Sequence, residues 1–146
     1  MADPKIFYLL HRSYRAAFKA ADRILLREFD ITTAQNSLLL YLDKHEGATM
    51  GAVATALGLG NAATSGLVDR TIKKGLIRRE ASAEDGRSFE LFLCDTGRDI
   101  AAHSKILIKA ANDRLMEGFD TGERDIIERF LLSVAEKADA MQINVQ

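Results

Sequence analysis

Basic side chains are the clearest candidates for chemistry in this sequence, and they are concentrated in one segment. The residues from Gly60 to Ser88 include six bases and four acids, so the segment carries a charge of +2. The whole chain carries −1, which leaves −3 for the remainder. The six bases are Arg70, Lys73, Lys74, Arg78, Arg79 and Arg87. A positive segment on a weakly acidic body is compatible with contact to phosphate groups.

The residue types that catalysis or metal binding needs are sparse and poorly spaced. The histidines His11, His45 and His103 are far apart, and none has a second ligand type at metal-binding spacing. A single cysteine, Cys94, excludes an intramolecular disulfide. The turn Gly58-Leu59-Gly60 is too short for a nucleotide-binding loop. We therefore expect no enzyme, no metal and no cofactor.

Length and composition indicate one helical domain. The chain has 146 residues, of which 47% are hydrophobic and 28% charged, with one proline and ten glycines. So few helix-breaking prolines favour long helices. The apolar stretch near the N-terminus is interrupted by His11, Arg12 and Arg15. It is therefore neither a signal peptide nor a membrane span, and we expect a cytoplasmic protein with no membrane partner.

The segment 49–75 has the pattern of two helices joined by a short turn. Thr49 can cap the first helix, and Gly58–Gly60 forms the turn. The second helix is expected from about Asn61 to Lys74, with Gly75 as a left-handed terminating residue. This order is typical of a helix-turn-helix.

A β-hairpin is expected directly after it. Residues 76–80 and 89–93 alternate apolar and polar side chains, and the polar stretch 81–88 between them contains Gly86. A helix-turn-helix followed by such a hairpin is a winged helix. The predicted fold class is thus mainly α with a small β-hairpin.

Amphipathic helices are expected on both sides of this module. Apolar residues recur at helical spacing over 5–28, and over 33–44 after a capping box at Thr32 and Gln35. The same spacing returns after Asp95 and continues to about Glu117. A last helix is expected over about 122–140, with Thr121 as its cap. The first and last helices carry more apolar surface than the module needs. We interpret the surplus as a homodimer interface, the alternative being that the two helices pack on each other within a monomer.

Five motifs, in order, resemble those of the MarR family of bacterial and archaeal regulators. The stretch 31–35 resembles the family's LTxxQ, and 67–70 its LVDRL. The stretches 75–79, 84–88 and 91–97 resemble KKGLVxR, a wing with DxRS, and LTxxG. Three departures are Gly66, where the family commonly has arginine, Gly86, where the wing usually has a second base, and Cys94, where threonine is usual. No cysteine lies near the first helix, which argues against thiol sensing.

The resemblance implies a single MarR-like domain over 1–146. Its winged helix-turn-helix would cover about 31–95, and its dimerisation helices about 4–29 and 97–141. The implied function is a transcriptional regulator, expected to be a repressor, that binds a pseudo-palindromic double-stranded DNA operator as a homodimer. The alternative is a winged-helix module that binds protein without sequence-specific DNA binding. The small side chains at Ala62, Ala63 and Gly66 keep that alternative open.

The expected DNA-binding residues follow from how a recognition helix enters the major groove. Its first residues should meet the base edges, with Asn61 pairing with adenine and methyl groups touching thymine. Asn61 could instead be only the helix cap. The remaining bases of the helix lie further along, within reach of phosphate. The full set is Asn61, Ala62, Ala63, Thr64, Ser65, Arg70, Lys73 and Lys74.

Arg87 is the residue of the wing that we expect to contact DNA. A wing-tip arginine can enter the narrow minor groove, where the negative potential is strongest in A·T tracts. Asp85, two residues earlier, could brace its guanidinium through a paired hydrogen bond. The alternative is a surface ion pair with no role in DNA binding.

The resemblance also implies a small aromatic or phenolic effector that releases DNA. It would bind between the dimer helices and the winged module. Tyr8, His11, Arg12 and Arg15 on the first helix could flank it, an arginine pairing with an anionic ligand. The alternative is a solvated helix face with a packed tyrosine.

Overall fold

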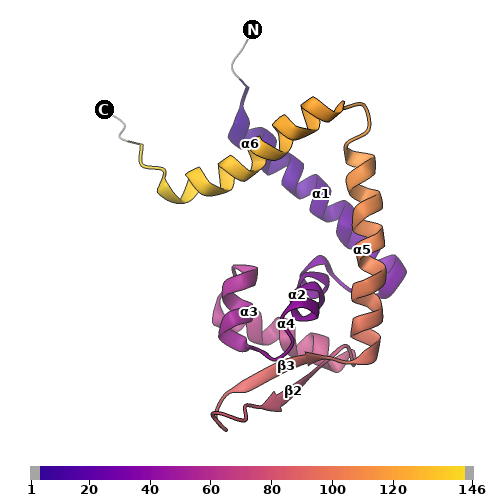
Figure 1. The fold of residues 1–146 in the computed structure, drawn as a ribbon, viewed down its shortest axis with the longest axis vertical. Coiled ribbons are helices and arrows are strands. Elements are labelled where there is room, and N and C mark those ends of the chain that lie inside the picture. The colour runs from indigo at the N-terminus through magenta and orange to yellow at the C-terminus, as the bar shows by residue number, and fades with distance from the viewer. Residues whose placement is uncertain (1–3, 144–146) are drawn as a thin grey trace. The chain divides into compact units, whose positions relative to one another are not determined.

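The computed structural model describes residues 4–143, and the chain forms six helices and three strands over this range (Figure 1). It divides into two compact units, one ending at Ile106 and the other beginning at Leu107. The elements are α1 (Ile6–Phe29), α2 (Thr33–Lys44), β1 (Ala48–Thr49), α3 (Met50–Leu57), α4 (Asn61–Lys73), β2 (Ile77–Ala81), β3 (Phe89–Leu93), α5 (Asp95–Leu115) and α6 (Thr121–Ala140). The predicted winged helix-turn-helix, with helices before and after it, is confirmed.

Local capping explains where the helices begin and end. At α2, the Gln35 amide donates to the Thr32 hydroxyl (3.2 Å) and the Thr32 amide to the Gln35 side chain (3.0 Å), which confirms the capping box. Gly75 ends the α4 region with a φ of 71°, as predicted. Thr121 was the wrong cap for α6. The N-cap is Asp120, whose carboxylate accepts the Glu123 amide at 2.9 Å in a capping box.

The sheet has three antiparallel strands in the order β1-β3-β2, one more than the predicted hairpin. In the hairpin, Ile77 pairs with Leu93 and Ala81 with Phe89. On the other edge, Ala48 pairs with Leu91. A strand of two residues has no period, and so β1 could not be recognised in the sequence.

The core of the first unit joins α2, α3, α4, the sheet and the beginning of α5. Figure 1 shows α2, α3 and α4 grouped beside the hairpin. The side chains that are at most 2% exposed include Ile31, Leu38, Leu39, Leu42, Val53, Leu67, Val68, Ile77, Leu91, Leu93 and Ala101. Such residues hold the recognition helix and the wing on one support.

The helices at the two ends of the chain expose large apolar side chains. On α1, Phe7 is 74% and Tyr14 61% exposed. In the second unit, α6 has no buried residue, and Leu132 is 60% exposed. Across residues 4–143, no helix combines the length and the apolar character that crossing a membrane requires.

A close backbone contact joins α5 to the turn between α4 and β2. The Leu76 carbonyl accepts the Cys94 amide at 3.0 Å. Gly97, in the first turn of α5, lies so near that a Cβ there would overlap the Leu76 carbonyl oxygen and lie 2.9 Å from its carbon. Only glycine therefore fits at position 97.

We expect Gly97→Ala to lower the free energy of unfolding by about 3 kcal/mol or more, because the methyl group would push α5 off Leu76. Urea denaturation at fixed protein concentration measures the loss. Gly51→Ala is the matched control, since nothing lies within 4 Å of its added Cβ. That variant should be as stable or gain up to about 1 kcal/mol. Equal stability of the two variants would contradict the steric role of Gly97.

Candidate nucleic-acid interface

The recognition helix α4 begins without a side-chain cap. Its N-cap is Gly60, and no side chain there accepts a hydrogen bond. The interpretation of Asn61 as the helix cap is therefore wrong, because Asn61 is the first helical residue. Its side chain is exposed and lies beside unoccupied backbone N–H groups. This helix start can present both amide donors and an Asn side chain to a nucleic acid.

Four of the five predicted residues in the first turns of α4 are exposed. These are Asn61, Ala62, Ala63 and Ser65. Thr64 is the exception and corrects the prediction. It is 1% exposed, and its hydroxyl donates to the Gly60 carbonyl at 2.9 Å. Thr64 lies on the buried face of α4 with Leu67. Its side chain therefore supports the start of the helix and is not available to contact DNA.

The two lysines at the end of α4 have different surroundings. Lys73 is exposed and has no ion pair within the described part of the chain. The Lys74 ammonium donates to the Asp30 carbonyl and lies 3.2 Å from the Asp30 carboxylate. Asp30 has a left-handed backbone (φ 55°) between α1 and α2. Its charge helps to hold this turn against the end of α4, and the contact of Lys74 with phosphate stays a prediction.

Arg70 lies over Gly66, one turn earlier on α4. A Cβ on Gly66 would lie 3.1 Å from Arg70 Nη1, so this flexible guanidinium would need to shift by only a few tenths of an ångström. Arg70 itself is exposed and has no ion pair among residues 4–143. Sequence patterns alone could not show this contact.

Short-range hydrogen bonds shape the wing tip. The Ser82 hydroxyl accepts the Asp85 amide at 3.4 Å, and the Ser88 amide donates to the Asp85 carbonyl at 3.1 Å. The Asp85 carboxylate accepts the backbone amide of Arg87 at 3.0 Å. The prediction that Asp85 braces the Arg87 guanidinium is therefore wrong. The carboxylate fixes the turn instead, because the Arg87 N–H is the nearer donor, and the exposed guanidinium extends without a carboxylate partner in the described residues.

An ion pair connects the wing to the recognition helix. Arg79 of β2 donates to the Asp69 carboxylate of α4 at 2.8 Å, and its guanidinium carbon lies 5.2 Å from the centre of the Phe89 ring. On the other side of β2, Arg78 stacks on Phe92 at 5.0 Å. Neither arginine was among the predicted site residues, because a pairing ten residues apart depends on how the hairpin packs on α4. The Asp69–Arg79 pair therefore connects the wing to α4, whereas the Arg78 contacts lie within the hairpin.

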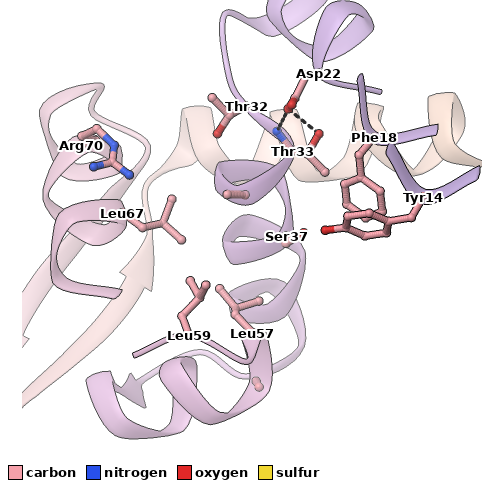
Figure 2. Close-up of a pocket in the computed structure, with 12 residues that line it drawn as sticks. Tyr14, Phe18, Asp22, Thr32, Thr33, Ser37, Leu57, Leu59, Leu67 and Arg70 are labelled. Carbon is pink, nitrogen blue, oxygen red and sulfur yellow. Dashed lines mark hydrogen bonds between the residues drawn. The ribbon is translucent and has the colours of Figure 1, made fainter. Parts of the chain in front are cut away.

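An open cavity of about 730 Å³ lies within the first unit beside α4 (Figure 2). Residues of α1, α2, α3 and α4 line it, including Tyr14, Phe18, Asp22, Leu57, Leu67 and Arg70. The Tyr14 and Phe18 rings are 4.4 Å apart. Figure 2 shows Asp22 directed to Thr33, whose amide (2.6 Å) and hydroxyl (2.5 Å) both donate to it.

The four residues predicted to flank an effector lie elsewhere on α1. Tyr8, His11, Arg12 and Arg15 line a separate, open hollow of about 410 Å³ along that helix. The structure therefore brings the four together, but not with the cavity of Figure 2. In residues 4–143, no group of three His, Cys, Asp or Glu side chains could hold a metal ion.

Comparisons with known proteins decide what this arrangement is. The family model described as the MarR family matches residues 29–88. A solved structure of the transcriptional repressor CouR bound to a 23-mer DNA duplex is 32% identical and covers 88% of this chain and 90% of its own, with a TM-score of 0.79.

The chain belongs to the MarR family.

Two further proteins are similar to this chain. The HTH-type transcriptional regulator TtmR of Methylorubrum extorquens is 28% identical over 85% of this chain, and the match spans 63% of TtmR's own length. The S. aureus MepR–DNA complex, 23% identical, covers 93% of this chain and 99% of its own with a TM-score of 0.84, and shows the shared fold. This MarR-family protein is a DNA-binding transcriptional regulator rather than an enzyme.

We expect Arg87→Ala to weaken binding to a duplex enriched from random DNA by about tenfold or more, because the wing loses its unpaired charge. Fluorescence anisotropy at matched salt measures the affinity. The melting temperature should stay unchanged, since Arg87 holds the turn only through its backbone amide. Unchanged affinity would remove Arg87 from the interface.

Lys73 and Lys74 form a matched pair. We expect Lys73→Ala to reduce the slope of log affinity against log salt by about one, as the loss of one phosphate contact does. Lys74→Ala should leave that slope nearly unchanged and lower stability instead, because it releases Asp30. A reversed pattern, in salt titrations and urea denaturation of both variants, would restore Lys74 to the DNA surface.

Proposed function

We propose that this MarR-family regulator is a repressor that binds a pseudo-palindromic operator as a homodimer. The exposed start of α4 would enter the major groove and Arg87 the flanking minor groove. One observation carries the proposal: the Asp69–Arg79 ion pair holds these two surfaces together on one support. The repressor role is also that of CouR by its description. We propose that the module at about 31–95 and its flanking helices act as one domain.

The dimer would form through the helices at the two ends of the chain. Both expose large apolar side chains, which an interface with a second copy would remove from water. Their charges are also complementary. Helix α1 has five Lys or Arg and two acids, whereas α6 has five acids and three Lys or Arg. A basic helix of one copy facing an acidic helix of another would add electrostatic attraction to apolar burial.

The cavity of Figure 2 would hold a small aromatic effector. Its volume of about 730 Å³ is in the range of ligand sites, and it combines two stacked rings with a few polar groups. Because α1 and α4 both line it, an occupant would contact a proposed dimer helix and the recognition helix at once. This position supports the cavity as the effector site over the hollow at Tyr8 and Arg15.

Selection from random duplex DNA on the purified protein tests the proposal. We expect enrichment of an inverted repeat whose half-sites lie about one helical turn, 10–10.5 base pairs, apart. Sedimentation should give a dimer both free and on that duplex. Enrichment of a single half-site bound by one copy would contradict the homodimer.

The protein-binding alternative gives a different result in the same experiment. No motif would be enriched, and binding to any duplex would lack the steep fall with salt that phosphate contact produces. Reporter repression from the enriched sequence, lost when one half-site is scrambled, then separates a repressor from an activator.

A further inference from the structure

We propose that Gly51, Gly60 and Gly66 keep the outer surface of α3 and α4 free of side chains, so that DNA can approach the backbone of these helices directly. The inference rests on the proposed function, in which α4 enters the major groove. It names the residues that set how closely the helix-turn-helix meets the duplex. The starting point is a group of glycines that the fold itself does not require.

The ten glycines of the chain differ in what the structure requires at each position. Gly97 has no room for a Cβ, and four others have a positive φ that favours glycine, namely Gly47, Gly58, Gly75 and Gly118. The other five have no positive φ, and no fixed group excludes a side chain there. They are Gly51, Gly60, Gly66, Gly86 and Gly122. All of these except Gly122 lie in the helix-turn-helix or at the wing tip, the surfaces proposed to meet DNA.

Local stability argues against glycine at the three positions of the helix-turn-helix. Gly51 and Gly66 lie inside α3 and α4, where glycine is less favourable than alanine. Gly60 is the N-cap of α4 and supplies no side-chain acceptor, whereas the N-cap residues of α2, α3 and α6 all do so. A residue type that lowers stability without improving packing indicates a constraint from outside the chain.

Open space surrounds the positions that the missing side chains would take. Nothing lies within 4 Å of a Cβ added to Gly51 or Gly60, and both residues are exposed. A Cβ on Gly66 would meet only the flexible end of Arg70, 3.1 Å away. Gly66 is two residues from Thr64, which is buried, and so it lies on the opposite face of α4. The free space at all three positions is therefore on the outside of the module.

Duplex DNA fits this free space. In a helix-turn-helix the first helix crosses the sugar–phosphate backbone, while the second lies in the major groove. Gly51 would then face the backbone of a strand and Gly66 the base edges, while Gly60 leaves the first amides of α4 open to a phosphate. No charged residue occurs between Glu46 and Asp69, so no long charged side chain holds this surface away from the duplex. Such a direct approach makes the affinity sensitive to a single added methyl group.

Substitution of these glycines tests the proposal, because stability and DNA binding should change in opposite directions. We expect Gly51→Ala and Gly66→Ala to keep or raise the melting temperature, yet to lower the affinity for the duplex enriched by selection by about fivefold or more. Gly60→Ser should likewise gain stability from a helix cap and lose affinity. Gly122→Ala adds the same methyl group to an exposed position of α6 and should leave the affinity unchanged, which makes it the matched control. Fluorescence anisotropy at matched salt and thermal unfolding at fixed protein concentration give the two quantities.

A second arm separates Gly66 from Arg70, since a methyl group at position 66 would also shift that guanidinium. We expect Gly66→Ala to lower the affinity by a similar factor in an Arg70→Gln background. A loss that disappears in this background would assign the effect to Arg70 and overturn the role of Gly66.

The remaining outcomes are equally decisive. Unchanged affinity of a glycine variant would remove that position from the surface, and unchanged affinity of all three would overturn the close approach. A loss of affinity together with a lower melting temperature would indicate a structural role and overturn it as well. If the parent protein enriches no duplex, the proposed function fails instead.

Discussion

The contact between Gly97 and the Leu76 carbonyl is the constraint on which the DNA-binding module depends. Leu76 follows the glycine that ends α4, precedes β2, and accepts the amide at the end of β3. The start of α5 then passes directly against it. Four elements therefore meet at one peptide unit. A shift of that unit would move the recognition helix and the wing relative to each other, because both are attached to it.

Two ion pairs fix the recognition helix α4 to the elements on either side of it. Asp69 and Arg79 join α4 to the hairpin, while Lys74 and Asp30 join it to the turn after α1. Exposed ion pairs contribute little to stability. Their effect here is on orientation, since each restricts the movement of α4 relative to one neighbouring element. Arg70 lies on the same helix, is exposed, and has no ion pair among residues 4–143.

Much of the fold could be predicted because its signals are local. The Thr32–Gln35 capping box, the Thr49 cap and the glycine at position 75 depend on residues within a few positions of each other. The wing was likewise visible as two alternating segments. By contrast, β1 is too short to have a pattern, and Asp120 and Thr121 are neighbours that can both cap a helix.

The candidate site was predictable in its position but not in its chemistry. Residue type indicated that Thr64, Lys74 and Asp85 could each serve DNA binding, yet their partners are Gly60, Asp30 and a backbone amide. These partners depend on packing, which composition does not reveal. The approach of Arg70 Nη1 to Gly66, 3.1 Å from where a Cβ would be, is another contact that residue type does not indicate.

The small residues at the start of α4 have a consequence for how this regulator can diverge. Ala62 and Ala63 are exposed and hold nothing in place. A polar side chain at either position would replace the methyl group expected to touch thymine with one that can form a hydrogen bond to a base edge. Because the buried residues of α4 are other ones, these two positions can change the base that the proposed interface prefers while the packing of the helix stays the same.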